Sequence, residues 1–479
     1  MSAKDAAPVP RGLVPALAFA ALTGAVVAGL GSPIVLDVAR ERGVSIEAAQ
    51  WTLTITLLVG VVGTPVVSRL GDGHRTRPIL VTSLLVVGAG SVCAALVPTF
   101  PGLLAGRAMQ GLGYAMVPLT VAIARQHLRG PRLNRTLAVL STSVAVGVGL
   151  GNPVMGFAVL VANYRVAFLV ALLVAVAGAV WVWRVVPSTA AARGPGVRVD
   201  VGGAVLLGVG LASSLLAIAK GQSWGWGSAP VVGLAVVGLL ALAGWVCVEL
   251  RVSSPLVDVR LACAHGVLGV NLSAILLGMA VFGGVAVMIL LVERPTTDGL
   301  GLGYSVFVNG LLMVPMSVAT LLSPPVSRWV IRYTGLRFVL PAGALAVAAA
   351  FGFFAVAHHS TWHIVVAMTL MGFGIGVAYA VMPALIVERT PRDRTASATG
   401  INQVLRLMGG AVGAAGAAAI LAAHVPPGRL DPEETGYVLA AVAAVVAAVA
   451  AAIVAFALVP ADRAGAVDEA PPTAVSPLT

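Results

Sequence analysis

The chain has 479 residues, of which 59% are hydrophobic and only 10% are charged, and its mean hydropathy is +1.01. About a quarter of the residues of a soluble globular domain are charged, so this composition excludes a soluble fold and predicts repeated membrane crossings. The net charge of +11 does not indicate nucleic-acid binding, because the arginines lie in short loops between apolar runs rather than on one face.

The apolar runs are long and continuous, which predicts membrane-spanning helices rather than the alternating strands of a transmembrane barrel. One span needs roughly 20 apolar residues. We therefore expect an all-α polytopic membrane protein with 14 transmembrane helices. In chain order the expected spans cover residues 12–36, 50–68, 78–97, 101–124, 136–160, 165–186, 201–219, 229–250, 267–292, 304–326, 336–357, 362–387, 396–423 and 436–459.

The distribution of Lys and Arg predicts which face of the membrane each loop lies on. With fourteen crossings, the termini and the even-numbered loops share one face, and they hold 21 of the 29 basic residues. Cytoplasmic loops carry the excess of Lys and Arg, so both termini are expected in the cytoplasm of a bacterial inner membrane. The opposite face holds Arg40, Arg42, Arg165, Lys220, Arg294 and Arg429.

Three pairs of segments recur at a spacing near 260 residues, which indicates an internal repeat. TPVVSRL at 64–70 parallels SPPVSRW at 323–329, YAMVP at 114–118 parallels YAVMP at 379–383, and Arg135-Thr136 parallels Arg394-Thr395. Two parallel six-helix repeats with two inserted helices are therefore expected, an arrangement used by transporters. The expected divisions are a cytoplasmic tail 1–11, a first bundle 12–187, an insert with its linkers 188–264, a second bundle 265–459 and a disordered tail 460–479.

Four polar or glycine-rich motifs interrupt the apolar pattern. The loop SRLGDGHRTRP at 68–78 contains Asp72 and Arg77, and a carboxylate there can accept charge-assisted hydrogen bonds that hold the cytoplasmic side closed. The sequence GRAMQGLG at 106–113 places Arg107 and Gln110 on one helical face, and an arginine inside a span is a functional candidate. The others are VGVGLGNPVMG at 146–156 and ATGINQVLRLMGG at 398–410, whose Asn402, Gln403 and Arg406 share one turn.

Together these motifs resemble those of the major facilitator superfamily, specifically its fourteen-helix drug:proton antiporter branch, over nearly the whole chain. Asp72 and Arg77 match the family's loop signature, whereas Ser68 and Gly73 depart from it. Asn152 stands where relatives usually have a proline. The resemblance implies an antiporter motif formed by Gly147, Gly149, Gly151, Pro153 and Gly156, and a central cavity to which Gln110 and the polar set Asn402, Gln403 and Arg406 contribute.

Proton coupling usually needs a carboxylate whose pKa changes as the site alternates between the two sides. Relatives carry an aspartate within the first span, but residues 27–33 of this chain contain none, and no acidic residue falls in the middle of a predicted span. The deepest carboxylates are Asp37 and Glu293, at the outer ends of the first and ninth spans. We expect these two to line an outer gate and to sense protons with Arg107. Coupling through Asp72 or Glu388, or a uniporter, remains an alternative.

The remaining polar residues are weaker candidates. Further cavity contacts are expected from Tyr114, Asn271, Asn309 and Tyr379, although each could simply bond a neighbouring helix. His358, His359 and His363 surround an outer loop, but no carboxylate is near them in the sequence, so no metal site is expected. No nucleotide-binding loop is present that would indicate ATP as the energy source.

The sequence thus predicts a secondary transporter that exports small amphipathic compounds, such as drugs, antibiotics or secondary metabolites, by proton antiport with alternating access. A nutrient transporter of the same fold is the main alternative, and a membrane-embedded enzyme or receptor is the other. No catalytic residues and no cofactor are expected, because the proton gradient would supply the energy. The expected partners are a small-molecule substrate and the lipid bilayer, with the chain acting as a monomer.

Overall fold

The computed structural model describes residues 10–30, 35–72, 75–161, 163–187, 200–252, 255–264, 266–296, 300–426 and 431–459, and these ranges are helical and contain no strand. The first part of the chain forms α1 (Leu13–Gly29), α2 (Val35–Arg42), α3 (Ile46–Leu70), α4 (Thr76–Leu96), α5 (Phe100–Gly111), η3 (Leu112–Ala115), α6 (Met116–His127), α7 (Gly130–Val161) and α8 (Tyr164–Val185). The middle forms α9 (Val201–Trp224), α10 (Ala229–Glu249) and α11 (Val259–Ala262). The last part forms α12 (Val267–Glu293), α13 (Val306–Leu312), α14 (Val314–Leu321), α15 (Ser323–Thr334), η5 (Leu336–Phe338), α16 (Val339–Val356), α17 (Thr361–Arg389), η6 (Arg392–Arg394), α18 (Thr395–Ala423) and α19 (Glu434–Leu458).

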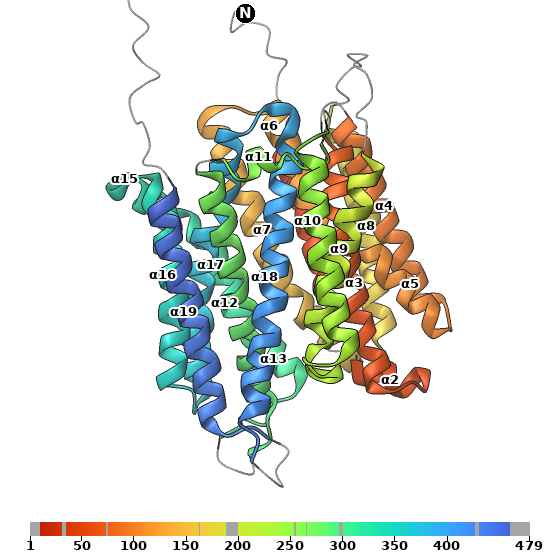
Figure 1. Cartoon of the computed structure of the whole chain (residues 1–479), viewed down its shortest axis with the longest axis vertical. Helices are drawn as coiled ribbons and strands as arrows, with labels where there is room; N and C mark the ends of the chain where they lie inside the picture. The colour runs from red at the N-terminus through yellow and green to blue at the C-terminus, as the bar shows by residue number, and fades with distance from the viewer. Residues whose placement is uncertain are drawn as a thin grey trace, which may run out of the picture.

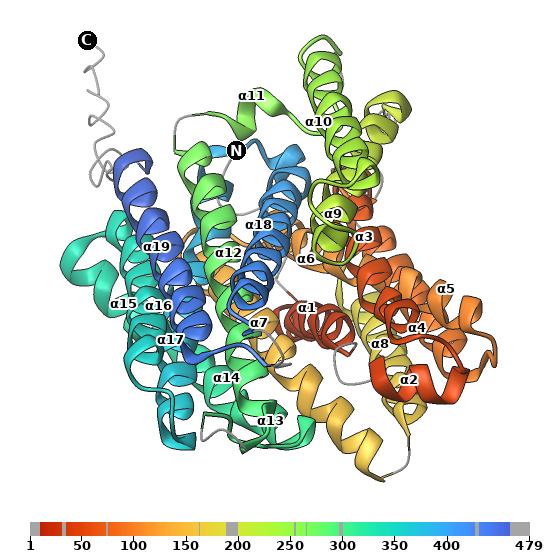
Figure 2. The same ribbon diagram turned by 60° about the horizontal axis from the view of Figure 1, so that its bottom comes forward.

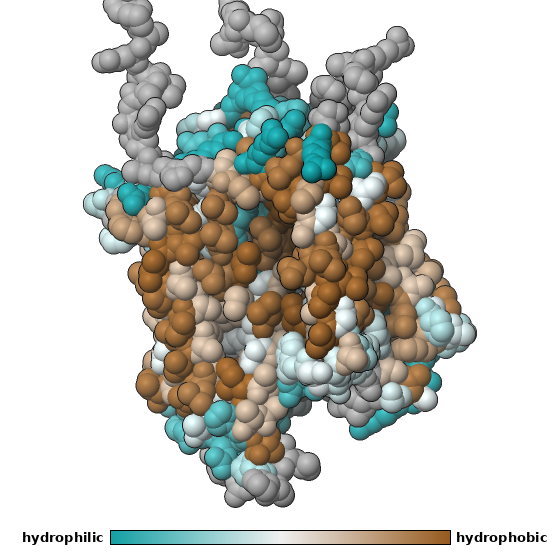
Figure 3. All heavy atoms as spheres, in the orientation of Figure 1, coloured by the Kyte–Doolittle hydropathy of each residue, from teal (hydrophilic) through white to brown (hydrophobic). Residues whose placement is uncertain are grey.

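The long helices run side by side along the long axis of the molecule (Figure 1). Within the described residues, eleven helices are long and apolar enough to cross a membrane, and a shorter apolar helix covers Leu13–Val27. The visible surface is hydrophobic in its middle and hydrophilic at both ends (Figure 3), as a bilayer requires. The expected all-α polytopic fold is therefore confirmed. The count of fourteen stays a prediction, since three of the expected spans, on α1, α5 with α6, and α7, are not among the eleven.

Prolines divide two of the expected spans. The span expected at 101–124 is interrupted by the 3-10 turn η3, which ends three residues before Pro118. The span expected at 304–326 is divided into α13, α14 and α15, and prolines lie in the first turns of α14 and α15. Proline has no N–H to donate to the carbonyl four residues earlier, so a helix reaching it loses a bond and readily ends or tightens there.

The first expected span is shorter than predicted and is followed by a separate surface helix. α1 ends at Gly29 rather than continuing to residue 36, and α2 lies across the lower end of the bundle (Figure 1). Arg42 holds α2 in place by donating to the Tyr164 hydroxyl at 3.1 Å and to the Pro98 carbonyl, and Glu41 pairs with Arg165. Asp37 belongs to α2, but its side chain lies outside the described residues.

Buried apolar residues form two large clusters. One cluster is built almost entirely from α1–α8, which we call the first bundle, and the other from α12–α19, which we call the second bundle. The bundles occupy opposite sides of the molecule (Figure 2). Val387 and Ala396 of the second bundle are buried in the cluster of the first, so the bundles pack together near the α17–α18 connection. The predicted domain boundaries stay a prediction.

The helices α9 and α10, which we call the inserted pair, lie beside the seam between the bundles (Figure 2). A third buried cluster joins Leu207 and Leu211 of α9 to Val61 of α3 and Val404 of α18. α10 exposes most of its apolar residues, among them Val236 and Leu240. Such a surface is suited to lipid contact, and α9 alone attaches to both bundles.

Candidate functional site

The two bundles meet through a carboxylate at the end of the molecule where α3 ends and α18 begins, which we call the arginine-rich end. Asp72 follows α3, and its Oδ1 accepts hydrogen bonds from the backbone N–H groups of Ala396 at 2.9 Å and Ser397 at 3.3 Å. These amides belong to the first turn of α18, where backbone donors have no partner within the helix. A side chain of the first bundle therefore caps a helix of the second bundle; we call this the Asp72 contact.

The Asp72 contact is almost sealed from solvent. Asp72 is 2% exposed, and this burial raises the pKa of its carboxyl from 3.8 to about 6, against the lowering effects of the bonds from Ser397 and Ala396 and of the Arg69 charge. Arg69 Nη1 lies 3.5 Å from Asp72 Oδ2. Because burial has the largest effect, the carboxyl takes up a proton more readily here than it would in water.

Further contacts reinforce the meeting of the bundles at this end. Arg125 of α6 donates to the Thr395 hydroxyl at 2.7 Å and to the Pro391 carbonyl at 3.2 Å. Arg394, directly before α18, forms an ion pair with Asp258 in the linker that follows the inserted pair. Arg77 lies elsewhere: its guanidinium donates to the Trp183 carbonyl at the end of α8.

Arg107 lies sealed within the first bundle. It is 0% exposed, and its Nε donates to the Thr52 carbonyl at 3.1 Å. Its Nη1 donates to the Gln110 Oε1 at 2.7 Å and approaches the Val27 carbonyl at 3.4 Å. Gln110 Nε2 in turn donates to the Ser91 hydroxyl at 2.9 Å. Sequence spacing correctly pairs Arg107 with Gln110, but the network joins α1, α3, α4 and α5 and does not line the pocket described next.

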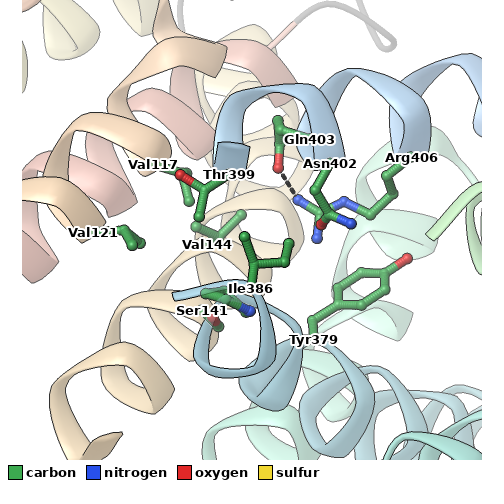
Figure 4. Close-up of a pocket in the computed structure, with 11 residues that line it drawn as sticks. Val117, Val121, Ser141, Val144, Tyr379, Ile386, Thr399, Asn402, Gln403 and Arg406 are labelled. Carbon is green, nitrogen blue, oxygen red and sulfur yellow. Dashed lines mark hydrogen bonds between the residues drawn. The ribbon is translucent and has the colours of Figure 1, made fainter. Parts of the chain in front are cut away.

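A pocket of about 30 Å³ lies between the two bundles (Figure 4). The first bundle contributes α6 and α7, and the second contributes α17 and α18. Five of its eleven lining side chains are aliphatic, and the other six supply one guanidinium, two amides, two hydroxyls and a phenol ring. The lining residues are Val117, Val121, Ser141, Val144, Tyr379, Pro383, Ile386, Thr399, Asn402, Gln403 and Arg406.

Arg406 is the charged group of this pocket. Its Nη2 donates to the Gln403 Oε1, and its guanidinium carbon lies 4.4 Å from the centre of the Tyr379 ring. Stacking of this kind compensates a cation that is taken out of water. Among the described residues, the buried Tyr379 hydroxyl has no hydrogen-bond partner. The pocket therefore presents a positive, planar group beside amide, hydroxyl and aliphatic side chains.

The other candidates of this set contact neighbouring helices, and among them Asn402 also lines the pocket. Asn402 Nδ2 donates to Asn271 Oδ1 at 3.0 Å, which ties α18 to α12. Asn309 Nδ2 donates to Glu293 Oε1 at 2.8 Å, within the second bundle. Tyr114 is half-buried and packs against Gly60 of α3, where an added Cβ would lie 2.2 Å from its ring.

The glycine motif of α7 is described only in part. Gly147 lies against α1, because a Cβ there would lie 2.7 Å from the Ala25 Cβ and 2.9 Å from the Leu22 carbonyl oxygen. Gly151 is buried. The side-chain surroundings of Gly149, Pro153 and Gly156 lie outside the described residues.

Sequence reasoning missed several residues of the pocket. Thr399 carried a usable signal, since it precedes Gln403 by four residues and Arg406 by seven and so lies on the same helical stripe. Ser141 and the aliphatic residues carried none, because ordinary membrane helices contain the same residue types. Arg125, which links the bundles, was read only as one of the loop arginines.

Comparison with known proteins gives a consistent result. The family model described as Major Facilitator Superfamily matches residues 16–414 and, in a second match, residues 268–478. The multidrug transporter protein MdtP of Bacillus subtilis (strain 168) is 22% identical over 406 residues, which cover 84% of this chain and 73% of that protein. The cephamycin export protein CmcT of Amycolatopsis lactamdurans is 31% identical over 280 residues, which cover 58% of this chain and 56% of that protein.

Solved structures show the same fold. The crystal structure of the human organic anion transporter MFSD10 (TETRAN) aligns with a TM-score of 0.63 at 17% identity, covering 95% of this chain and 100% of that chain. A POT family transporter in complex with a thioalcohol-conjugated peptide also gives a TM-score of 0.63, at 14% identity. At these identities the likeness concerns the arrangement of helices.

Proposed function

Since the chain belongs to the Major Facilitator Superfamily and is a multi-pass membrane transporter, we propose that it exports small amphipathic compounds such as drugs, antibiotics or secondary metabolites. Inward proton flow drives the export, and the two bundles alternate between inward-facing and outward-facing arrangements. The arginine-rich end faces the cytoplasm of a bacterial inner membrane. The names of the relatives MdtP and CmcT favour an exporter over an importer.

The position of the pocket carries this proposal. Its wall is divided between the bundles, with α6 and α7 on one side and α17 and α18 on the other. Movement of one bundle against the other therefore changes the size of the pocket and its access to either face. A site inside a single bundle, such as the Arg107 network, would move as a unit and would not alternate.

The chemistry of the pocket supports amphipathic compounds. Aliphatic side chains of α6, α7 and α17 supply apolar contact, while Arg406 and the hydroxyls of Ser141 and Thr399 supply a few directed polar contacts. Sites for drug-sized molecules combine these two features. A guanidinium favours compounds with a carboxylate or another acceptor.

The pocket is smaller in this structure than a drug-sized compound requires. A space of about 30 Å³ holds roughly two water molecules, whereas drug-sized ligands occupy roughly 300–1,000 Å³. The Asp72 contact holds the bundles together at the arginine-rich end. Substrate enters from the cytoplasm after this contact separates.

Proton coupling is proposed to involve Asp37, Asp72, Arg77, Arg107 and Glu293. Asp72 is the best supported of these, because it lies between the bundles and burial raises its pKa to about 6, within reach of cellular pH. Glu293 interacts with Asn309 inside one bundle, and Arg107 is held by carbonyl groups. An Asp37→Asn/Glu293→Gln double variant and an Asp72→Asn variant would separate an outer proton site from an inner one in transport driven by a pH gradient.

Efflux measurements test the proposal. Energised cells that express the chain are loaded with a panel of fluorescent drugs and antibiotics, with and without a protonophore. We expect lower accumulation of at least one amphipathic compound, and loss of that difference when the protonophore is added. Equal accumulation with and without the gene for every compound would contradict export, and uptake of a nutrient would favour an importer of the same fold.

Matched variants connect the transport to the pocket. Arg406→Ala and Tyr379→Ala remove the cation and the ring on which it stacks, and we expect each to reduce efflux about tenfold or more. Tyr379→Phe keeps the ring and should retain most of the transport of compounds that do not use the hydroxyl. Arg389→Ala serves as the control, because Arg389 lies on α17 and, among the described residues, bonds to the Leu385 carbonyl of its own helix and pairs with Glu388.

A further inference from the structure

Two histidines and one glutamate converge at the end of the second bundle that is opposite the arginine-rich end. His358 and His359 follow α16, and Glu434 is the first residue of α19. One ligand atom from each of the three side chains lies within 4.8 Å of the other two. This group could not be expected from sequence spacing, because Glu434 is 75 residues from the nearer histidine and only the packing of α19 against α16 brings it close.

The hydrogen bond of His358 fixes which ring nitrogen faces Glu434. His358 Nδ1 lies 2.9 Å from the Phe354 carbonyl oxygen, and because a carbonyl only accepts, Nδ1 carries the proton. In the neutral ring Nε2 then presents a lone pair. That atom lies 3.1 Å from the Glu434 Oε1, which in the ionised carboxylate is also an acceptor. Two lone pairs at this distance repel each other unless a proton or a metal ion lies between them.

His359 directs a second nitrogen to the same oxygen. Its Nε2 lies 3.5 Å from Glu434 Oε1, and the two imidazole rings are 4.4 Å apart. Ligand atoms that each lie 2.0–2.1 Å from a tetrahedral zinc ion are about 3.4 Å from one another. The two measured nitrogen-to-oxygen distances are close to this spacing, so the group needs little rearrangement to hold an ion.

We propose that His358 Nε2, His359 Nε2 and a Glu434 carboxylate oxygen form a binding site for a divalent transition-metal ion, with Zn²⁺ as the best match. Two imidazoles and a carboxylate are a donor set that suits zinc. The Phe354 carbonyl orients His358 in the way that outer partners orient metal-bound histidines. His358 is buried, whereas the side chains of His359 and Glu434 are 55% and 52% exposed, so an ion and a water ligand can enter from solvent.

The site would join two separate parts of the second bundle. The histidines lie in the short turn between α16 and α17, and Glu434 lies in the first turn of α19. A bound ion would link this turn to α19 and stabilise the outer end of the bundle. The inference does not depend on the proposed export function, since the residues are not in the pocket and neither bundle must move.

Metal binding to the purified, full-length protein without a polyhistidine tag tests the site. Zn²⁺ binding is measured by titration calorimetry, Co²⁺ binding by its visible absorption, and the bound metal is counted per chain. We expect one ion per chain in the unmodified protein. The affinity should be at least tenfold weaker in His359→Ala and in Glu434→Gln. Zn²⁺ should raise the unfolding temperature of the unmodified protein, and both variants should lose this rise.

Two control variants distinguish a specific site from general surface binding. Glu433→Gln removes the neighbouring exposed carboxylate, and His127→Ala removes a histidine on α6 of the first bundle. Both should bind Zn²⁺ as the unmodified protein does. Absence of stoichiometric binding would show that His358 and Glu434 form only a proton-dependent ion pair and would overturn the proposal. Equal binding by a His359→Ala/Glu434→Gln double variant would overturn it as well.

Discussion

At Asp72, burial and helix capping act in opposite directions on one carboxyl group. The amides of Ala396 and Ser397 favour the ionised form, while removal from water disfavours it more strongly, so the pKa rises from 3.8 to about 6. In the proposed transport cycle the bundles separate at this end, so the carboxyl should become solvated and its pKa should return towards the ordinary value. The closed arrangement therefore binds a proton more tightly than the open one.

The sign of the pH effect follows from this difference. A group whose pKa is raised in the closed state stabilises that state fully below the ordinary value of 3.8, and the stabilisation is lost as the pH rises through about 6. Each unit of pKa difference corresponds to about 1.4 kcal/mol. Acidification of the cytoplasmic side from about pH 7 to pH 5 should thus favour closure of the Asp72 contact.

Labelling of a cysteine in the pocket measures this closure. In a background without Cys93, Cys247 and Cys263, Ser141→Cys is exposed to a thiol reagent from the arginine-rich side of inside-out vesicles. We expect Asp72→Ala to increase the labelling rate severalfold, because both α18 amides lose their acceptor. Asp72→Asn keeps a carbonyl acceptor and should leave the rate low and independent of pH, after correction for the reactivity of the thiol.

An exposed carboxylate at the same end provides the control for this prediction. Glu388 lies 3.8 Å from Arg389 and its side chain is 59% exposed, so Glu388→Gln should leave the labelling rate and its pH dependence unchanged. A rate that falls as the pH rises, or an Asp72→Ala variant that labels no faster than the parent, would contradict the assigned role of Asp72.

Sequence reasoning about single residues succeeded where the partners lie on one helix. Three-residue spacing placed Gln110 beside Arg107 and Gln403 beside Arg406, because helical geometry fixes such neighbours. Spacing could not reveal the partner of Asp72, which lies 324 residues away. The position of Arg107 in the sequence predicted its depth in the membrane. It could not predict which way the side chain points, since a helix can turn its polar face into its own bundle or towards the other one.

At the scale of helices, small residues allow α12 and α18 to pack with their backbones in contact. A Cβ added to Gly409 of α18 would lie 2.1 Å from the Ile275 carbonyl oxygen of α12. Similarly, a Cβ on Gly278 would lie 2.2 Å from the Arg406 carbonyl oxygen. Close approach of this kind stabilises membrane helices through packing, because lipid supplies no hydrophobic driving force between them. It also fixes the position of the α18 turn that carries Arg406.

Substitution of these glycines should separate the two helices. Gly409→Ala places a methyl group against backbone atoms that cannot rotate away, so we expect its unfolding temperature in detergent to fall by several degrees and its transport to fall with it. Gly416→Ala is the matched control on the same helix, because a Cβ there meets no atom within 4 Å. The packing argument fails if both variants unfold at the same temperature as the parent.

Hydropathy predicted where most of the helices lie but not how they are divided. The runs at 201–219, 229–250 and 362–387 match α9, α10 and α17 closely, since any long apolar segment in a bilayer must satisfy its backbone within a helix. The separation of α1 from α2 and of α13 from α14 depends on glycine, proline and tertiary contact. Average hydropathy does not detect such breaks.

For the whole molecule, the inserted pair is connected to the contact between the bundles. Glu249 at the end of α10 accepts hydrogen bonds from the Leu256 amide at 3.0 Å and the Val257 amide at 3.3 Å, which hold the linker. The next residue, Asp258, pairs with Arg394 directly before α18. The insert, the linker and the α18 terminus thus form a continuous series of contacts at the arginine-rich end, and all of them must lie on one side of the membrane.

Single-cysteine labelling tests this arrangement and the predicted fourteen crossings together. In the background without native cysteines, an impermeant maleimide should label Gly227→Cys, between α9 and α10, and Glu433→Cys, before α19, in intact cells. Arg129→Cys, between α6 and α7, and Asp393→Cys, between α17 and α18, should label only after the cells are opened, because the excess of arginine retains these loops in the cytoplasm. All four positions are exposed, so accessibility does not depend on packing. Labelling of Gly227→Cys and Glu433→Cys from opposite sides would mean an odd number of crossings between them, which two parallel bundles joined by a helix pair do not permit.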